Sequence, residues 1–164
     1  GESNFVACMT AILSQMEHSH YTNYINAFQT RQDLMDFLME TFIMFKDLIG
    51  KNVYPPDWMV MSMVQNRVFL RAISQYAETL NKMFLNSNCF ELQLWNNYFH
   101  LTVAFLTQES LQLENFSNAK RAAIICKYGD MRGIIGAGIR DMWYNLGKTL
   151  DFYFSYQSAT LSIF

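Results

Sequence analysis

Residues 90–100 read Phe-Glu-Leu-Gln-Leu-Trp-Asn-Asn-Tyr-Phe-His, and they decide the fold because their polar and apolar positions separate at helical spacing. Uncharged polar side chains recur on one face, and they are Gln93, Asn96, Asn97, His100 and Thr107. An apolar stripe of Leu94, Tyr98, Leu101 and Phe105 lies beside the rings Trp95 and Phe99. This periodicity predicts a packed helix over about 90–108 with an uncharged amide face.

Helical spacing fills most of the remaining sequence, and the adjacent prolines Pro55 and Pro56 interrupt it. Thr30 followed by Asp33 indicates a helix start, and Gly50 suits the end of the same helix. The further helices are predicted over about 4–17, 19–28, 30–50, 58–86, 118–128 and 131–146. Neither a fixed-period repeat nor the tetratricopeptide consensus is recognisable. The predicted fold is therefore all-α, with stacked antiparallel helices of a degenerate α-solenoid of the armadillo, HEAT or tetratricopeptide-like type.

The composition is apolar and weakly charged. The chain has 164 residues, the length of one ordinary domain, and 51% of them are hydrophobic. Charged residues make up 16%, against roughly 25% in an average domain, so we expect additional surface to be hidden against neighbours. The net charge is −2, and no basic cluster is denser than Lys120-Arg121. Nucleic acid is therefore not an expected partner, because its binding requires several convergent cations.

Cellular location is inferred from cysteines and hydrophobic runs. Cys8, Cys89 and Cys126 are an odd number without paired spacing, which predicts reduced, buried thiols of a cytoplasmic protein. No run reaches the ~18 apolar residues of a membrane span, and no signal peptide is recognisable, so direct membrane insertion is not expected. Because the first residue is Gly1, we expect a processed chain or a piece of a longer one.

Two segments have both a functional and a structural interpretation. Residues 58–64 read Trp-Met-Val-Met-Ser-Met-Val, which predicts a helix sandwiched between others. A methionine-lined groove for varied partners is the alternative, and core filling is favoured. Four carboxylates share one face of the predicted helix 30–50, and they are Asp33, Asp36, Glu40 and Asp47. A solvated face is favoured over a metal or acid–base site, because the sequence supplies no further ligands.

No catalytic, cofactor-binding or metal-binding residue is predicted, and no cofactor. Residues 133–138, Gly-Ile-Ile-Gly-Ala-Gly, superficially resemble a phosphate-binding loop but have no preceding strand and no following Lys-Ser/Thr. His18 and His20 would diverge on a helix, and His100 lies on the amide face, so three convergent zinc ligands are not expected. No serine nucleophile elbow is present, and no cysteine has a base nearby in the sequence.

Long specific blocks occur between residues 4 and about 147. They include Asn-Phe-Val-Ala-Cys-Met-Thr-Ala-Ile-Leu at 4–13, Asp-Phe-Leu-Met-Glu-Thr-Phe-Ile-Met-Phe-Lys at 36–46, and the stretches 63–73, 90–100, 105–114, 129–132 and 139–144. Together these blocks resemble the dedicator-of-cytokinesis family of guanine-nucleotide exchange factors, closest to its Rac-directed founding subfamily. The resemblance implies a helical-repeat scaffold in the middle of a larger protein, between a phosphoinositide-binding β-sandwich domain and the exchange domain. None of the family's catalytic residues maps onto this chain.

The resemblance also implies partners and a boundary. The parent would activate a Rac-type small GTPase in cytoskeletal remodelling and cell migration, with plasma-membrane recruitment through its other domains and self-association as a further expectation. Gly133 and Gly138 stand where bulkier or charged residues are expected. From about Lys148 the resemblance stops, so we expect a scaffold over 1–147 and a divergent tail over 148–164 from alternative splicing, a retained intron or a gene-model error. A free-standing interaction module, or a truncated isoform competing for the parent's partners, is the alternative function.

Overall fold

The computed structural model describes residues 1–51, 53–85 and 90–161, without the side chains of Glu2 and of 152–161. Its α-helices are α1 (Glu2–Gln15), α2 (His18–Asn26), α3 (Arg31–Ile49), α4 (Met59–Met83), α5 (Leu92–Leu106), α6 (Asn118–Tyr128) and α7 (Met131–Leu161). Two short 3-10 helices, η2 (Glu109–Leu111) and η3 (Leu113–Asn115), follow α5. Every regular element in the described ranges is a helix, which confirms the predicted all-α class.

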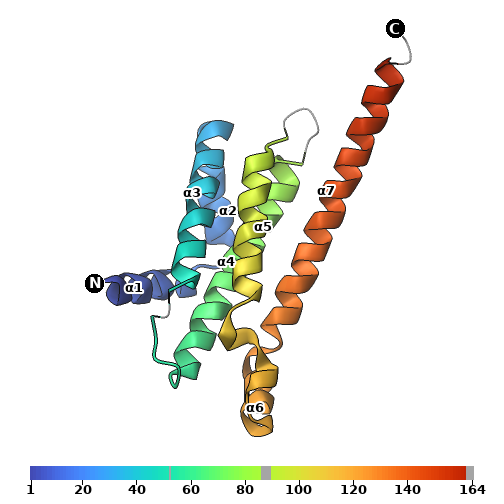
Figure 1. Cartoon of the computed structure of the whole chain (residues 1–164). Coiled ribbons are helices and arrows are strands. Elements are labelled where there is room, and N and C mark those ends of the chain that lie inside the picture. The colour runs from blue at the N-terminus through green and yellow to red at the C-terminus, as the bar shows by residue number, and fades with distance from the viewer. Residues whose placement is uncertain (52, 86–89, 162–164) are drawn as a thin grey trace.

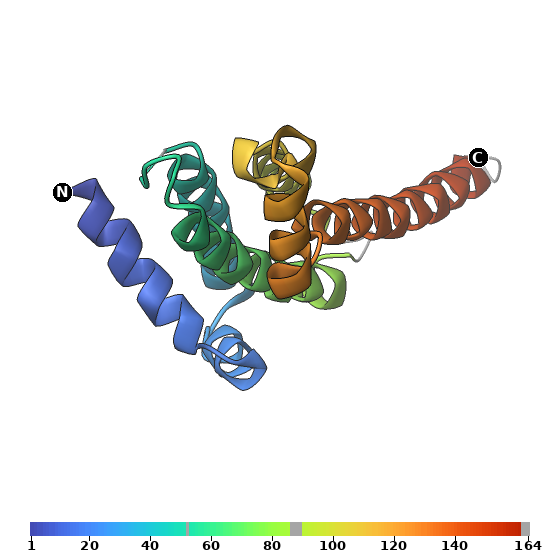
Figure 2. The same cartoon turned by 90° about the horizontal axis from the view of Figure 1, so that it is seen from below.

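The helices stack in a layer around α3, α4 and α5 (Figure 1). Helix α3 packs on α5, α1 packs on α4, and α7 packs on both α4 and α5. Seen from below, α1 and α7 lie at the two ends of this layer (Figure 2). The strongest contacts therefore join helices that are two or three positions apart in the chain, as between successive repeats of an α-solenoid.

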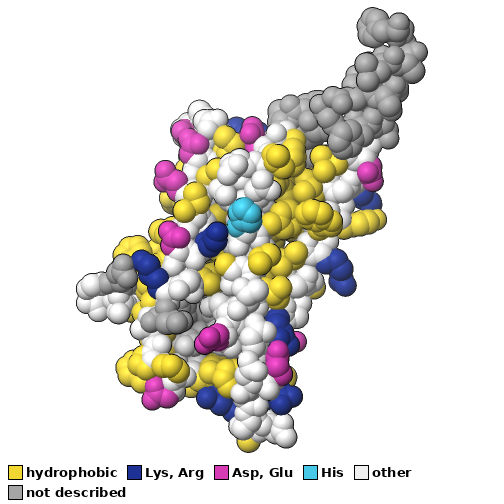
Figure 3. All heavy atoms as spheres, viewed as in Figure 1, with side chains coloured by type: hydrophobic (Ala, Val, Ile, Leu, Met, Phe, Trp, Pro, Cys, Tyr) yellow, Lys and Arg dark blue, Asp and Glu magenta, His cyan; other side chains and the backbone are white. Residues whose placement is uncertain are grey.

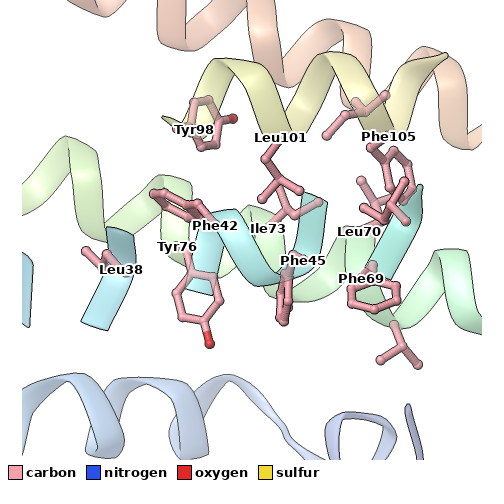
Figure 4. Close-up of a cluster of buried hydrophobic side chains, with 14 of the residues drawn as sticks. Leu38, Phe42, Phe45, Phe69, Leu70, Ile73, Tyr76, Tyr98, Leu101 and Phe105 are labelled. Carbon is pink, nitrogen blue, oxygen red and sulfur yellow. The ribbon is translucent and has the colours of Figure 1, made fainter. Parts of the chain in front are cut away.

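Aromatic side chains join the three central helices. The Phe42 ring on α3 lies edge-on to Tyr76 on α4, at 6.1 Å between centroids, and edge-on to Tyr98 on α5, at 6.0 Å. Leu101 and Ile73 fill the space beside them (Figure 4), and both are at most 1% exposed. Edge-to-face ring pairs add about 0.5–1.5 kcal/mol each beyond their buried area, so this contact fixes how α3, α4 and α5 pack.

Local sequence signals account for the helix ends. The Thr30 Oγ1 accepts a hydrogen bond of 3.0 Å from the Asp33 backbone N–H, which confirms the predicted start of α3. Glu17 and His20 form a reciprocal capping box at α2 that the sequence analysis missed, because histidine is not the usual partner in this motif. Gly129 separates α6 from α7 with a φ of 74°, a conformation that favours glycine.

Two predicted helices differ from the observed ones. The start of α4 is not sandwiched, because Trp58 just before the helix and Val60 and Met61 in its first turn are 43–58% exposed, while Met63 is fully buried. This turn directly follows the loop that contains Pro55 and Pro56. Helix α7 was predicted to end near Leu146 but continues to Leu161, across the predicted boundary at residue 147. The origin of the segment 148–164 stays a prediction, and residues 162–164 lie outside the described residues.

Candidate interaction surfaces

Helix α5 presents two different faces. Its inner side chains Leu94, Trp95, Tyr98, Leu101 and Phe105 are at most 1% exposed, as the apolar stripe predicted. Of the predicted amide face, Gln93, Asn96, His100 and Thr107 are exposed. Asn97 instead turns toward α3, where its Nδ2 lies 3.2 Å from the Met39 sulfur. The exposed amide face is therefore narrower than predicted, and it offers neutral donors and acceptors to a partner.

Trp95 ties the start of α5 to the end of α4. Its indole Nε1 donates to the Phe84 carbonyl at 3.0 Å, and its ring stacks on Phe90 at 6.2 Å between centroids. The ring is 0% exposed, so the donor is buried and satisfied. Trp95 is a structural anchor and is not available to a partner.

Burial also suppresses the acid–base chemistry of two central phenols. Burial raises the pKa of Tyr98, and burial together with the neighbouring Tyr21 and Tyr24 raises the pKa of Tyr76. Both phenols therefore remain neutral around pH 7, where they act as packing rings.

Aromatic side chains form an exposed ledge between α5 and α7, which we call the Trp143 ledge and which contains Phe99, Trp143 and Tyr144. The Trp143 ring packs edge-on against Phe99 at 5.5 Å between centroids, yet the Trp143 side chain is 65% exposed. Tyr144, the next residue on α7, is 60% exposed. Hydrophobic side chains gather over α5 and α7 in the same region (Figure 3). Exposed rings beside apolar neighbours are typical of protein-interaction surfaces.

At the other end of the layer, an open groove lies between α1 and α3. One hollow of about 270 Å³ is lined by Phe5, Cys8, Met9, Ile12, Leu13, Phe37, Thr41, Met44, Phe45 and Tyr76. A second hollow of about 650 Å³ is lined by Gly1, Phe5, Glu40, Ile43, Met44, Asp47, Leu48 and Lys51. Because Phe5 and Met44 line both hollows, they adjoin, and we call them together the α1–α3 groove. Sequence analysis missed it, although Phe5, Met9 and Ile12 recur at helical spacing.

Polar side chains elsewhere mainly hold loops and helix starts. Asn66 on α4 donates to the Ser110 Oγ at 2.9 Å, and this fixes η2 beside α4. Arg132 at the start of α7 donates to Gln112 Oε1 at 2.6 Å and to Glu114 Oε1 at 3.0 Å. The hydrogen bond from Arg132 holds the pKa of the Glu114 carboxyl below its usual value. These contacts connect the segment after α5 to α7.

The histidines and carboxylates do not converge. His18 Nδ1 lies 2.8 Å from Gln75 Oε1, whereas His20 Nδ1 accepts from the Glu17 backbone N–H at 2.8 Å. Among the side chains that the structure describes, no three His, Cys, Asp or Glu residues are grouped to hold a metal ion. The carboxylates of α3 are all exposed, as the solvated-face interpretation predicted, and they are Asp33, Asp36, Glu40 and Asp47. The lack of a catalytic residue stays a prediction.

The cysteine prediction was partly wrong. Cys8 and Cys126 are exposed rather than buried, while Cys89 lies outside the described residues. Among the described side chains, α1 buries Val6, Thr10 and Leu13, and α6 buries Ile124, so neither Cys8 nor Cys126 lies on a covered face.

The structure also bears on the resemblance of residues 133–138 to a phosphate-binding loop and on the expected lack of a membrane-spanning helix. Gly133 to Gly138 lie inside α7, so their backbone amides belong to a helix rather than to a phosphate-binding loop. In the described part of the chain, no helix is long and apolar enough to cross a membrane.

Comparison with known proteins gives a consistent result. A family model described as the dedicator of cytokinesis (DOCK) TPR region matches residues 2–155, beyond the predicted boundary at 147. Dedicator of cytokinesis protein 4 from Mus musculus and from Homo sapiens is 42% identical over 144 residues, and protein 3 from Homo sapiens is 37% identical over the same length. These alignments cover 88% of this chain but only 7% of each relative. The chain belongs to the dedicator-of-cytokinesis family and corresponds to its tetratricopeptide-like helical region.

Proposed function

We propose that this chain is a non-catalytic helical scaffold segment of a guanine-nucleotide exchange factor that activates Rac. One observation carries the proposal: a single packed core presents apolar surface at both ends, the α1–α3 groove at one and the Trp143 ledge at the other. An isolated small domain normally buries such surfaces, whereas a layer of a helical array covers them with the next helices. Family membership supports the same interpretation.

In this proposal the exchange reaction belongs to another domain of the parent. The scaffold would space membrane-binding and catalytic parts, because stacked helices form a stiff body. Its partners are the neighbouring domains, and a Rac-type GTPase binds through the exchange domain. We place the parent in the cytoplasm, with recruitment to the plasma membrane through other domains, and in cytoskeletal remodelling and cell migration.

A denaturing blot of the endogenous protein tests the scaffold proposal. With an antibody raised to residues 91–116, we expect a band roughly ten times larger than the 19.2 kDa chain, as for a protein of many domains. A band near 19.2 kDa alone would contradict the scaffold proposal and favour a free-standing module that competes for the parent's partners.

A nucleotide-release assay tests the non-catalytic assignment separately. The isolated chain is added to Rac loaded with a fluorescent nucleotide, and a complete exchange domain serves as the positive control. We expect release at the spontaneous rate. Stimulated release by the isolated chain would overturn the assignment.

A further inference from the structure

We infer that the α1–α3 groove is the receptor for an amphipathic helix with basic residues along one edge, supplied by another part of the same long polypeptide. The inference rests on the proposed function, because it assumes that this chain is one layer of a larger helical array. It adds which surface the adjacent helix occupies and what chemistry that helix carries.

Helix α1 has two apolar faces, and only one of them is covered. Helix α1 packs on α4 and buries Val6 and Thr10, which are at most 7% exposed. Phe5 and Ile12 are 53% and 60% exposed and line the groove. Burying apolar surface stabilises a complex by about 25 cal/mol for each Å² removed from water. The exposed face of α1 therefore favours the binding of another helix.

The opposite wall and the floor of the groove are also lined by apolar and aromatic side chains. Met44 and Phe37 of α3 form the wall, and Tyr76 of α4 contributes to the floor. Helix α1 has 14 residues and is about 21 Å long at 1.5 Å per residue, so the groove can hold roughly four turns of another helix. Helices that lie in such grooves insert apolar side chains spaced three to four residues apart.

Charge on the rim specifies the occupant further. Residues 3–16 of the chain contain no Asp, Glu, Lys or Arg, so the described side chains of α1 form an uncharged wall. Glu40 and Asp47 of α3 line the larger hollow and are exposed. They are seven residues apart, about 10.5 Å along the helix. Acidic side chains also follow the α3 edge in Figure 3.

The cations of the occupant should therefore lie beside α3, about two turns apart. Lys51, just after α3, is a positive side chain that lines the same hollow. It lies beyond the C-terminal end of α3, so the helical part of the α3 wall carries the acidic Glu40 and Asp47. An acidic helix would meet Glu40 and Asp47 with like charge, so the charge pattern discriminates against it.

The length of the relatives identifies the source. The alignment covers 7% of each relative, so most of such a polypeptide lies outside this chain. A helix on the same polypeptide is present at high effective concentration, and it binds without the entropy cost of bringing two molecules together. We therefore commit to a helix of the same polypeptide rather than to a separate protein.

Cys8 provides a direct reporter because it is exposed and lines the groove. Cys126 on α6 is also exposed and lies outside the groove, so it serves as an internal reference in the same molecule. The rate of iodoacetamide modification at each cysteine is measured by peptide mass spectrometry, in the isolated chain and in the endogenous full-length polypeptide. We expect Cys8 to react at least about tenfold more slowly in the full-length polypeptide, with the Cys126 rate changed much less.

Variants test whether the groove itself causes this protection. Ile12→Ser removes an exposed apolar contact, and Glu40→Lys reverses a rim charge, so both should speed Cys8 modification in the full-length polypeptide. Asp141→Lys makes the same charge change at an exposed position of α7 and should leave the Cys8 rate unchanged. Circular dichroism checks that all three variants keep their helices. Protection that neither Ile12→Ser nor Glu40→Lys relieves would overturn the inference.

Synthetic helices test the charge preference of the groove separately from the origin of the helix that occupies it. An 18-residue Leu/Lys amphipathic peptide should slow Cys8 modification in the isolated chain, and a Leu/Glu peptide with the same apolar pattern should do so far less. Equal protection by both peptides would overturn the charge assignment. Equal Cys8 rates in the full-length polypeptide and in the isolated chain would overturn the same-polypeptide source, even if the Leu/Lys peptide binds. The blot described above tests the scaffold function independently of these rates.

Discussion

Helices α5 and α7 are both rich in rings, yet they are buried to very different degrees. Trp95 on α5 is 0% exposed, whereas Trp143 on α7 is 65% exposed. Helix α5 lies between α3 and α7, while α7 packs on α4 and α5 from one side only. Composition alone therefore does not decide whether a ring belongs to the core. The number of neighbouring helices decides it, and a layer at the end of an array keeps one side open.

The two tryptophans make this comparison testable. Trp95→Ala should lower the free energy of unfolding by about 3–5 kcal/mol, because it leaves a cavity and strands the Phe84 carbonyl. Trp143→Ala should cost about 1 kcal/mol or less, because the ring loses mainly one edge contact with Phe99. Urea denaturation followed by far-ultraviolet circular dichroism measures both. Equal losses would mean that α7 is as enclosed as α5.

Two glycines of α7 test whether one side of this helix is open. A Cβ at Gly138 would meet no other atom within 4 Å, so Gly138→Ala should stabilise the chain by about 0.5–1 kcal/mol through helix propensity alone. Gly133→Ala is the matched control, because the added Cβ would lie 3.0 Å from Asp130 Oδ2. This variant should therefore gain less stability than Gly138→Ala. The thermal midpoint of each variant gives the order. A loss of stability in Gly138→Ala would mean that this side of α7 is already covered.

The helices were largely predictable from the sequence because hydrophobic spacing is a local signal. The start of α3 at Thr30 and the bounds of α6 required only neighbouring residues. The exposure of Cys8 and of Met61 was not predictable, because it depends on which helix packs on each face. The α1–α3 groove was missed for the same reason: Phe5 and Ile12 resemble core residues until α1 is placed against α4.

The start of α7 offers the smallest expected effect, since it depends on an exposed ion pair. Arg132 donates to Glu114 and lowers the pKa of that carboxyl, so the unfolded chain binds more protons than the folded chain near and below pH 4.5. The stabilising contribution of Glu114 is therefore complete above pH 4.5 and is lost as the pH falls through the folded pKa. Glu114→Gln should lower the urea midpoint slightly at pH 6, and its difference from the parent chain should shrink as the pH falls through the folded pKa of Glu114. Added salt should shrink the difference at pH 6, because both groups are exposed to solvent. A difference independent of pH would mean that Arg132 holds α7 through Gln112, whose Oε1 accepts at 2.6 Å and does not titrate.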